Sequence, residues 1–163
     1  MTSLKVGMIG PGGIAHRKLL PALSKTDKLQ LWSVMSRSKE RAGKAADEFG
    51  AASATPAYDD LGAMLADPEL DAVIIATPDK LHAQQTIAAA KAGKHVLVEK
   101  PMTTSVADAE AMVAACREAN VKLGVAYHLR WHAGLRPLHA DVMQCKLGTL
   151  RHMRVQWTWH APD

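Results

Sequence analysis

An acid and an amine stand side by side at Glu99 and Lys100, between the apolar run 95–98 and Pro101. A lysine ammonium can donate to a substrate hydroxyl oxygen and help to move its proton. Glu99 could orient that ammonium or contact a cofactor ribose. The alternative is a solvent-exposed ion pair between these two side chains, which is common for adjacent residues of opposite charge. The pair therefore predicts proton-transfer chemistry only if the chain places it beside a bound substrate.

A glycine-rich segment has the spacing of a diphosphate-binding loop. Gly10, Gly12 and Ala15 follow the pattern G-x-G-x-x-A between an apolar run and a helical segment. Gly10 permits a tight turn, Gly12 leaves room for a pyrophosphate, and Ala15 lets the helix pack closely on the strand. The N–H groups of Gly12, Gly13 and Ile14 would then point at the phosphate from a helix N-terminus. A glycine-rich turn without a ligand is the alternative.

The residues that end the second apolar run indicate which dinucleotide would fit. A site for NAD usually has an acid there, which binds the ribose hydroxyls. This chain has Ser36 and Arg37 instead, with Lys39 and Arg41 close behind. A guanidinium can bind a 2′-phosphate through paired hydrogen bonds. The sequence therefore favours NADP and leaves NAD open, and a solvated arginine at a helix start is the alternative for Arg37.

The elements that would position these groups follow from the alternation of short apolar runs with segments of helical period. Strands are predicted at 4–10, 29–36, 53–58, 71–77, 95–100 and 121–128, and helices at 13–25, 39–50, 59–67, 79–94 and 105–120. This order predicts an α/β fold with a doubly wound parallel sheet. Ligands bind such sheets at the carboxyl ends of the strands. The glycine-rich loop, Arg37 and Lys100 all follow a predicted strand.

The last part of the chain has a different pattern. A helix is predicted over 133–148. Apolar and polar residues alternate over 150–160, with Met153, Val155, Trp157 and Trp159 on one side. Alternation of this kind predicts a half-buried strand. That strand has no partner in the chain, so we expect it to open a second domain.

Composition limits the classes of partner. The 163 residues carry a formal net charge of +4, and the basic residues are spread rather than clustered. A surface that receives small anionic molecules is favoured over a nucleic-acid interface. Cys116 and Cys145 lack metal-ligand spacing, so we expect reduced thiols and no metal site. The sequence has no signal peptide and no apolar run of membrane-spanning length, which predicts a cytoplasmic protein without a membrane partner.

Five segments together resemble the Gfo/Idh/MocA family, the group of glucose–fructose oxidoreductase and inositol dehydrogenase. They are VGMIGPGGIA, SRSKER, ATPDKLHA, AGKHVLVEKPM and GVAYHLRWHAGLRPL, in the order and spacing of that family. The resemblance covers essentially the whole chain, and GKHVLVEKP is its most specific element. It implies an NAD(P)-binding Rossmann domain over 1–127. Over 128–163 it implies a connecting helix and the first strand of a truncated α/β domain for substrate binding and dimerisation.

The resemblance also implies roles for individual residues. Lys100 occupies the lysine position of the family's E-K-P motif, which makes it the expected catalytic residue. His128 is a further acid/base candidate, and Arg130 and Trp131 resemble residues that face the cofactor or substrate. The residues implied on the cofactor side are Gly10, Gly12, Gly13, Ile14, Thr77, Pro78, His82 and Glu99.

These observations lead to a leading hypothesis and two rivals. The first is an NAD(P)-dependent oxidoreductase that transfers a hydride to or from a sugar, cyclitol, dihydrodiol or similar compound near Lys100. Family members are generally longer chains, so we expect a homodimer or larger oligomer of a full-length parent and little turnover from this chain alone. One rival is a dinucleotide-binding sensor without catalysis. The other is a fragment whose exposed apolar edge, containing Met153 and Val155, could pair with another chain or aggregate.

Overall fold

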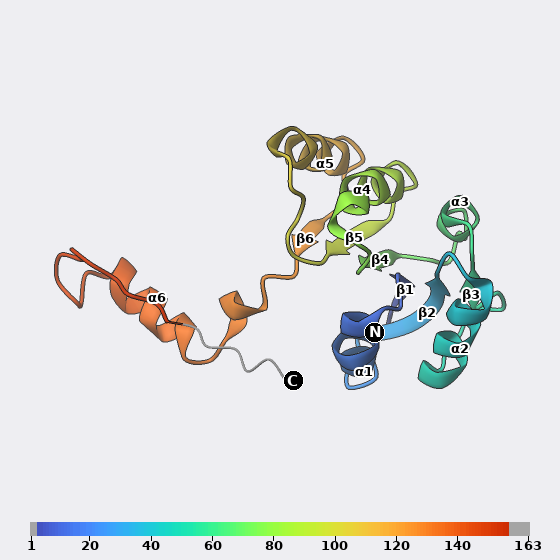
Figure 1. The fold of residues 1–163 in the computed structure, drawn as a ribbon, viewed down its shortest axis with the longest axis horizontal. Helices are drawn as coiled ribbons and strands as arrows, with labels where there is room; N and C mark the ends of the chain where they lie inside the picture. The colour runs from blue at the N-terminus through green and yellow to red at the C-terminus, as the bar shows by residue number, and fades with distance from the viewer. Residues whose placement is uncertain (1–2, 157–163) are drawn as a thin grey trace, which may run out of the picture. The chain divides into compact units, whose positions relative to one another are not determined.

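A computed structural model describes residues 3–156 as two compact units, which divide after Ala126. Within these described residues, the first unit contains a sheet of six strands (Figure 1). The strands are β1 (Leu4–Ile9), β2 (Leu29–Met35), β3 (Ala57–Tyr58), β4 (Ala72–Ile75), β5 (His95–Val98) and β6 (Leu123–Val125). Their order is β3-β2-β1-β4-β5-β6, and every neighbouring pair is parallel. The predicted doubly wound parallel sheet is confirmed, and its strand order changes direction between β1 and β4.

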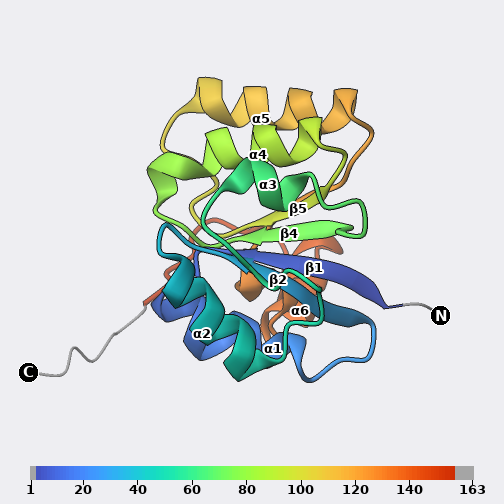
Figure 2. The same cartoon turned by 90° about the vertical axis from the view of Figure 1, so that its right-hand side faces the viewer.

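Helices cover both faces of the sheet. Figure 2 shows α1 and α2 on one face and α3, α4 and α5 on the other. The bounds are η1 (Ala15–Leu19), α1 (Leu20–Leu23), α2 (Lys39–Phe49), α3 (Leu61–Leu65), η2 (Asp79–Leu81), α4 (His82–Lys91) and α5 (Val106–Glu118). The helix after the glycine-rich loop is widened: η1 is a π-helical turn in which the Leu20 N–H donates to the Ala15 carbonyl. Pro21 follows and has no N–H to donate into that turn.

Local sequence signals account for several helix ends. The Ser38, Asp60 and Ser105 side chains accept hydrogen bonds from backbone N–H groups in the first turns of α2, α3 and α5. The α2 helix ends at Gly50, whose φ of 67° is left-handed and suits glycine. These three caps and the glycine stop follow from residues close in the sequence, since Ser and Asp favour the N-cap and Gly favours the left-handed end of a helix.

The core has one apolar cluster on each face of the sheet. Val6, Met8 and Ile74 face α1 and α2, whereas Ile9 and Ile75 face the other set of helices. All four residues of β4 are buried, as expected for a central strand covered on both sides. The free thiol of Cys116 is also buried, and burial raises its pKa, which favours the neutral thiol.

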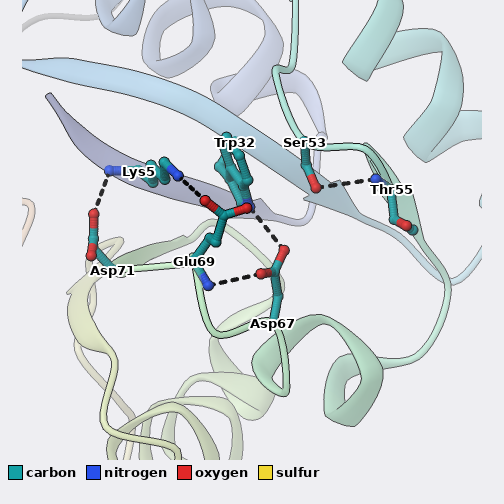
Figure 3. Close-up of polar contacts among 7 residues, drawn as sticks. All are labelled: Lys5, Trp32, Ser53, Thr55, Asp67, Glu69 and Asp71. Atoms are coloured by element: carbon teal, nitrogen blue, oxygen red, sulfur yellow. Dashed lines mark hydrogen bonds and ion pairs between the residues drawn. The ribbon is translucent and has the colours of Figure 1, made fainter.

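Polar contacts join the strands near the amino ends of β1 and β4 (Figure 3). The Lys5 backbone N–H donates to the Asp71 carboxylate at 2.8 Å, and the Lys5 ammonium pairs with Glu69. The same ammonium lies 4.0 Å from the Trp32 ring centre, and Trp32 Nε1 donates to Asp67 at 2.8 Å. These contacts tie β1 and β2 to the segment before β4, at the edge opposite the carboxyl ends.

Lys94 is a buried cation at this amino edge. Its Nζ donates to the carbonyl oxygens of Asp67 and Leu70, at 2.7 and 2.8 Å, and the residue is 8% exposed. We predict that Lys94→Met lowers the free energy of unfolding by about 1–3 kcal/mol, because it leaves buried carbonyls without donors. Urea denaturation measures this loss. Lys91→Met, at an exposed position of α4, is the control, and an equal loss in both variants would contradict the assignment.

The second unit contains η3 (His128–Trp131) and α6 (Leu135–Met143). The helix predicted over 133–148 is therefore shorter than expected. The predicted strand is wrong over 150–156, where the chain has no helix or strand. A strand needs a neighbour for its backbone hydrogen bonds, and the described residues of this unit provide none. Trp157 and Trp159 lie outside the described residues. Among residues 3–156, no helix has the length and apolarity needed to cross a membrane.

Candidate cofactor site

A cavity of about 430 Å³ opens in the first unit at the carboxyl ends of β1, β2 and β4. Its lining residues are Gly10, Pro11, Gly12, Met35, Ser36, Arg37, Arg41, Ala76, Thr77, Pro78, Lys80, Leu81 and Gln85. This is the edge where the strand order changes direction, which is where doubly wound sheets bind ligands. The structure thus brings together six residues that the sequence predicts for the cofactor site and that come from three separate loops: Gly10, Gly12, Ser36, Arg37, Thr77 and Pro78.

The glycine-rich loop has the geometry that its spacing predicts. Gly10 has a φ of 86°, and its N–H donates to the Met35 carbonyl at 2.9 Å. A Cβ at Gly10 would lie 2.8 Å from the Thr77 methyl group, whereas a Cβ at Gly12 would meet no atom within 4 Å. Gly12, Gly13 and Ile14 are exposed, and Ala15 is fully buried against the sheet. The loop therefore leaves open space beside backbone N–H groups at the start of a helix.

This difference between the two glycines can be tested with a pair of alanine variants. We expect Gly12→Ala to keep the stability of the fold within about 0.5–1 kcal/mol, because its methyl group has space and its φ is not positive. Its affinity for NADPH should fall at least about tenfold, which is about 1.4 kcal/mol, because the methyl occupies the space of the diphosphate. Gly10→Ala should instead destabilise the fold by about 1–3 kcal/mol.

Thermal denaturation and a fluorescence titration with NADPH measure the two effects separately. Unchanged NADPH affinity in Gly12→Ala would show that the diphosphate does not bind at this loop.

Cations dominate the charge of the cavity. Arg37, Arg41 and Lys80 line it, and none of its lining residues is an Asp or Glu. Ser36 is 8% exposed, and its N–H donates to the Tyr58 carbonyl at 3.0 Å, which holds the end of β2 against β3. Such an arrangement suits an anionic group such as a 2′-phosphate. Lys80 was not predicted as a site residue, although it lies two residues after Pro78 in the segment that follows β4.

Thr77, Gln85 and His82 form a small network at the end of β4. The Thr77 hydroxyl donates to the Gln85 side-chain oxygen at 2.6 Å. The His82 ring is 1% exposed, with Nε2 2.9 Å from the Thr77 carbonyl and Nδ1 2.9 Å from the Pro101 carbonyl. Both ring nitrogens thus face protein carbonyl groups, and the role of His82 on the cofactor side stays a prediction. Gln85 was missed, although its spacing of three residues from His82 places both on one face of α4.

Glu99 and Lys100 follow β5, which pairs with β4. The Glu99 N–H donates to the Ile75 carbonyl at 2.8 Å, and the Glu99 carboxylate accepts from the Lys100 backbone N–H at 3.0 Å. The Lys100 residue is exposed, and the peptide bond to Pro101 is cis. No ion pair joins the two side chains within residues 3–156. Lys100 is thus placed at the same edge of the sheet as Thr77 and the cavity.

The remaining predicted residues, His128, Arg130 and Trp131, belong to η3 in the second unit. Trp131 is 77% exposed, and the Arg136 guanidinium lies 5.6 Å from its ring centre. Arg130, Arg136 and His139 contribute to a basic hollow of about 650 Å³ in that unit. The roles of His128, Arg130 and Trp131 toward a cofactor or substrate stay predictions.

Comparison with known proteins identifies the family of this chain. The model of an oxidoreductase family with an NAD-binding Rossmann fold, Gfo/Idh/MocA, matches residues 4–127. The chain belongs to this family. The resemblance seen in its sequence motifs is therefore confirmed, and so is the Rossmann fold of the first unit.

Several members of the Gfo/Idh/MocA family are similar over most of this chain. A 1,5-anhydro-D-fructose reductase of Ensifer adhaerens is 39% identical over 87% of this chain and 41% of its own length. A D-xylose 1-dehydrogenase (NADP(+)) of Haloferax volcanii is 35% identical over 96% of this chain and 47% of its own. A 3-ketoreductase from Actinomadura kijaniata, solved in complex with NADP, is 33% identical, with a TM-score of 0.81 over 91% of this chain and 46% of its own. The chain thus spans less than half the length of these relatives.

Proposed function

We propose that the protein is an NADP-dependent oxidoreductase. It transfers a hydride between the nicotinamide and a sugar, cyclitol, dihydrodiol or similar hydroxy or oxo compound. The observation that carries the proposal is the cavity that combines open space at Gly12 with the Arg37, Arg41 and Lys80 cations. Lys100, at the end of the neighbouring strand, supplies a proton donor. Membership of an oxidoreductase family supports the same reading.

The residues present fit NADP. The N–H groups of Gly13 and Ile14 would bind the diphosphate, and Ser36 and Arg37 would bind the 2′-phosphate. The Gly12 N–H donates to the Gly10 carbonyl at 2.8 Å in this structure, so it would join the diphosphate site only by leaving that partner. Two of the relatives carry NADP in their name or crystal complex, which supports the phosphate-bearing form. NAD remains the second choice, because the sequence of the loop does not exclude it.

A bound nicotinamide cofactor would supply the hydride for reduction or accept it for oxidation, and the residues of the protein would move the proton. In the reductive direction the Lys100 ammonium donates its proton to the substrate oxygen as the carbonyl becomes an alcohol. In the oxidative direction the neutral amine accepts that proton. Thr77, Pro78 and Glu99 would bound the nicotinamide end of the site, on the cofactor side of Lys100.

The second domain, the oligomeric state and the location are proposed from two facts: the chain belongs to this family, and it spans less than half the length of the relatives it matches. The region 128–163 would open a domain for substrate binding and dimerisation, with His128, Arg130 and Trp131 near the substrate. The complete protein would act on small molecules as a homodimer or larger oligomer in the cytoplasm, without nucleic-acid or membrane partners.

Two measurements test the proposal. Fluorescence titration of this chain should give a lower Kd for NADPH than for NADH, and absence of binding to either would overturn it. A screen of the complete protein against sugars and polyols with both cofactors then tests turnover. Tight NADPH binding with no turnover in any complete version would favour the rival hypothesis of a dinucleotide-binding sensor.

A further inference from the structure

His82 makes contacts that join two functional loops of the first unit. It is the first residue of α4, and its ring lies between the loop after β4 and the loop after β5. One ring nitrogen meets the carbonyl of Thr77, which lines the cavity, and the other meets the carbonyl of Pro101, which directly follows Lys100. We infer that His82 is a positioning residue for Lys100, an inference that takes the catalytic role of Lys100 from the proposed function.

Backbone contacts explain why Lys100 depends on this ring. The Glu99 N–H donates to the Ile75 carbonyl and so continues the β4–β5 ladder. Beyond that point the Lys100 N–H, among residues 3–156, bonds only to the neighbouring Glu99 carboxylate. The next polar contact along the chain is that of the Pro101 carbonyl, 2.9 Å from the ring of His82 in helix α4. Lys100 therefore lies between two contacts that hold the chain, one at Glu99 and one at Pro101. The contact at Pro101 is lost without His82.

The His82 ring bridges the Thr77 and Pro101 carbonyl groups, and Thr77 is held in place by contacts that do not involve His82. The Thr77 hydroxyl donates to Gln85, and the Thr77 methyl group lies against the backbone of Gly10. Thr77 thus has a fixed place beside the glycine-rich loop. The ring contacts Thr77 on one side and Pro101, next to Lys100, on the other. It therefore holds Lys100 at a fixed distance from the cavity in which the cofactor is proposed to bind.

Histidine places one ring nitrogen beside each of the two carbonyl groups. Carbonyl oxygens only accept hydrogen bonds, so a ring with protons on both nitrogens donates to both loops, and a neutral ring donates to one. A glutamine has a single amide nitrogen that can donate and reaches only one of the two carbonyls. A phenylalanine fills the space and donates to neither. Met102, next along the loop, packs against the apolar core, so the loop stays attached to the fold in these variants.

The test uses the isotope-labelled chain without cofactor, so it does not depend on turnover. In His82→Phe, the carbonyl carbon shifts of Thr77 and Pro101 should both change. The backbone order parameter of Lys100 should fall from about 0.85 to below about 0.6. His82→Gln should change one carbonyl shift strongly and loosen Lys100 less. Thr86→Val is the matched control, because Thr86 is fully buried one turn further along α4 and its hydroxyl has no partner.

Kinetics of the complete protein give the second readout. His82→Phe should lower kcat by roughly 100-fold, as expected for a displaced catalytic group, with the Kd for NADPH changed less than about threefold. An unchanged Lys100 order parameter in both His82 variants would overturn the inference while leaving NADPH binding intact. Absence of NADPH binding to the unmodified chain would instead remove the proposed function, and the carbonyl shifts would still report the bridge.

Discussion

In the complete protein, Lys100→Met is expected to abolish most turnover and to leave NADPH binding in place. The ammonium supplies or removes the proton on the substrate oxygen, and methionine has a side chain of similar length without a transferable proton. Loss of a general acid or base of this kind lowers kcat by roughly 10²–10⁴-fold. Steady-state kinetics measure the loss, and a fluorescence titration measures the Kd for NADPH.

Lys122→Met is a suitable control for that experiment, because Lys122 is exposed and lies just before β6, at the amino edge of the sheet. Its kcat should match that of the unmodified protein. Near-normal turnover in Lys100→Met would remove Lys100 from the catalytic role. A parallel loss of NADPH affinity would show that Lys100 contributes mainly to cofactor binding.

Arg37→Asp is expected to reverse the cofactor preference. The guanidinium lies in the cavity at the end of β2, and a hydrogen bond between charged groups contributes about 1.5–3 kcal/mol. Its loss should weaken NADPH binding roughly tenfold to 150-fold, and repulsion between the new carboxylate and the phosphate adds to the loss. NADH lacks the 2′-phosphate, so its Kd should change less than about threefold. Paired titrations with both cofactors measure this difference.

Arg117→Asp provides the matched control, because Arg117 is an exposed residue in the last turn of α5, outside the cavity. It makes the same change in net charge and should leave the ratio of the two Kd values unchanged. The loss in Arg37→Asp should also shrink at high salt, because an exposed charge pair is screened. An equal loss for both cofactors would mean that Arg37 has a structural role.

Local signals in the sequence were sufficient to predict the fold of the first unit. Continuous apolar runs such as 72–75 marked buried strands, and Ser105 and Gly50 marked helix ends, because these preferences depend on residues close in the chain. The glycine spacing at 10–12 predicted the turn and the open space beside it for the same reason. The absence of an acid after β2 was likewise visible in the sequence alone.

Contacts between distant segments were decided only by the tertiary structure. The sequence predicted Thr77 and Pro78 at the cavity but not Lys80 and Gln85, which follow them in the chain. The fold of η2 and α4 decides which of these later side chains reach the cavity. The predicted strand over 150–156 did not form, since alternation marks a surface that could be buried but does not supply the neighbour that would bury it. His82 is the clearest case: its motif predicted a residue on the cofactor side. Only the fold shows that the ring is buried and that two carbonyl groups 24 residues apart, those of Thr77 and Pro101, lie beside its two nitrogens.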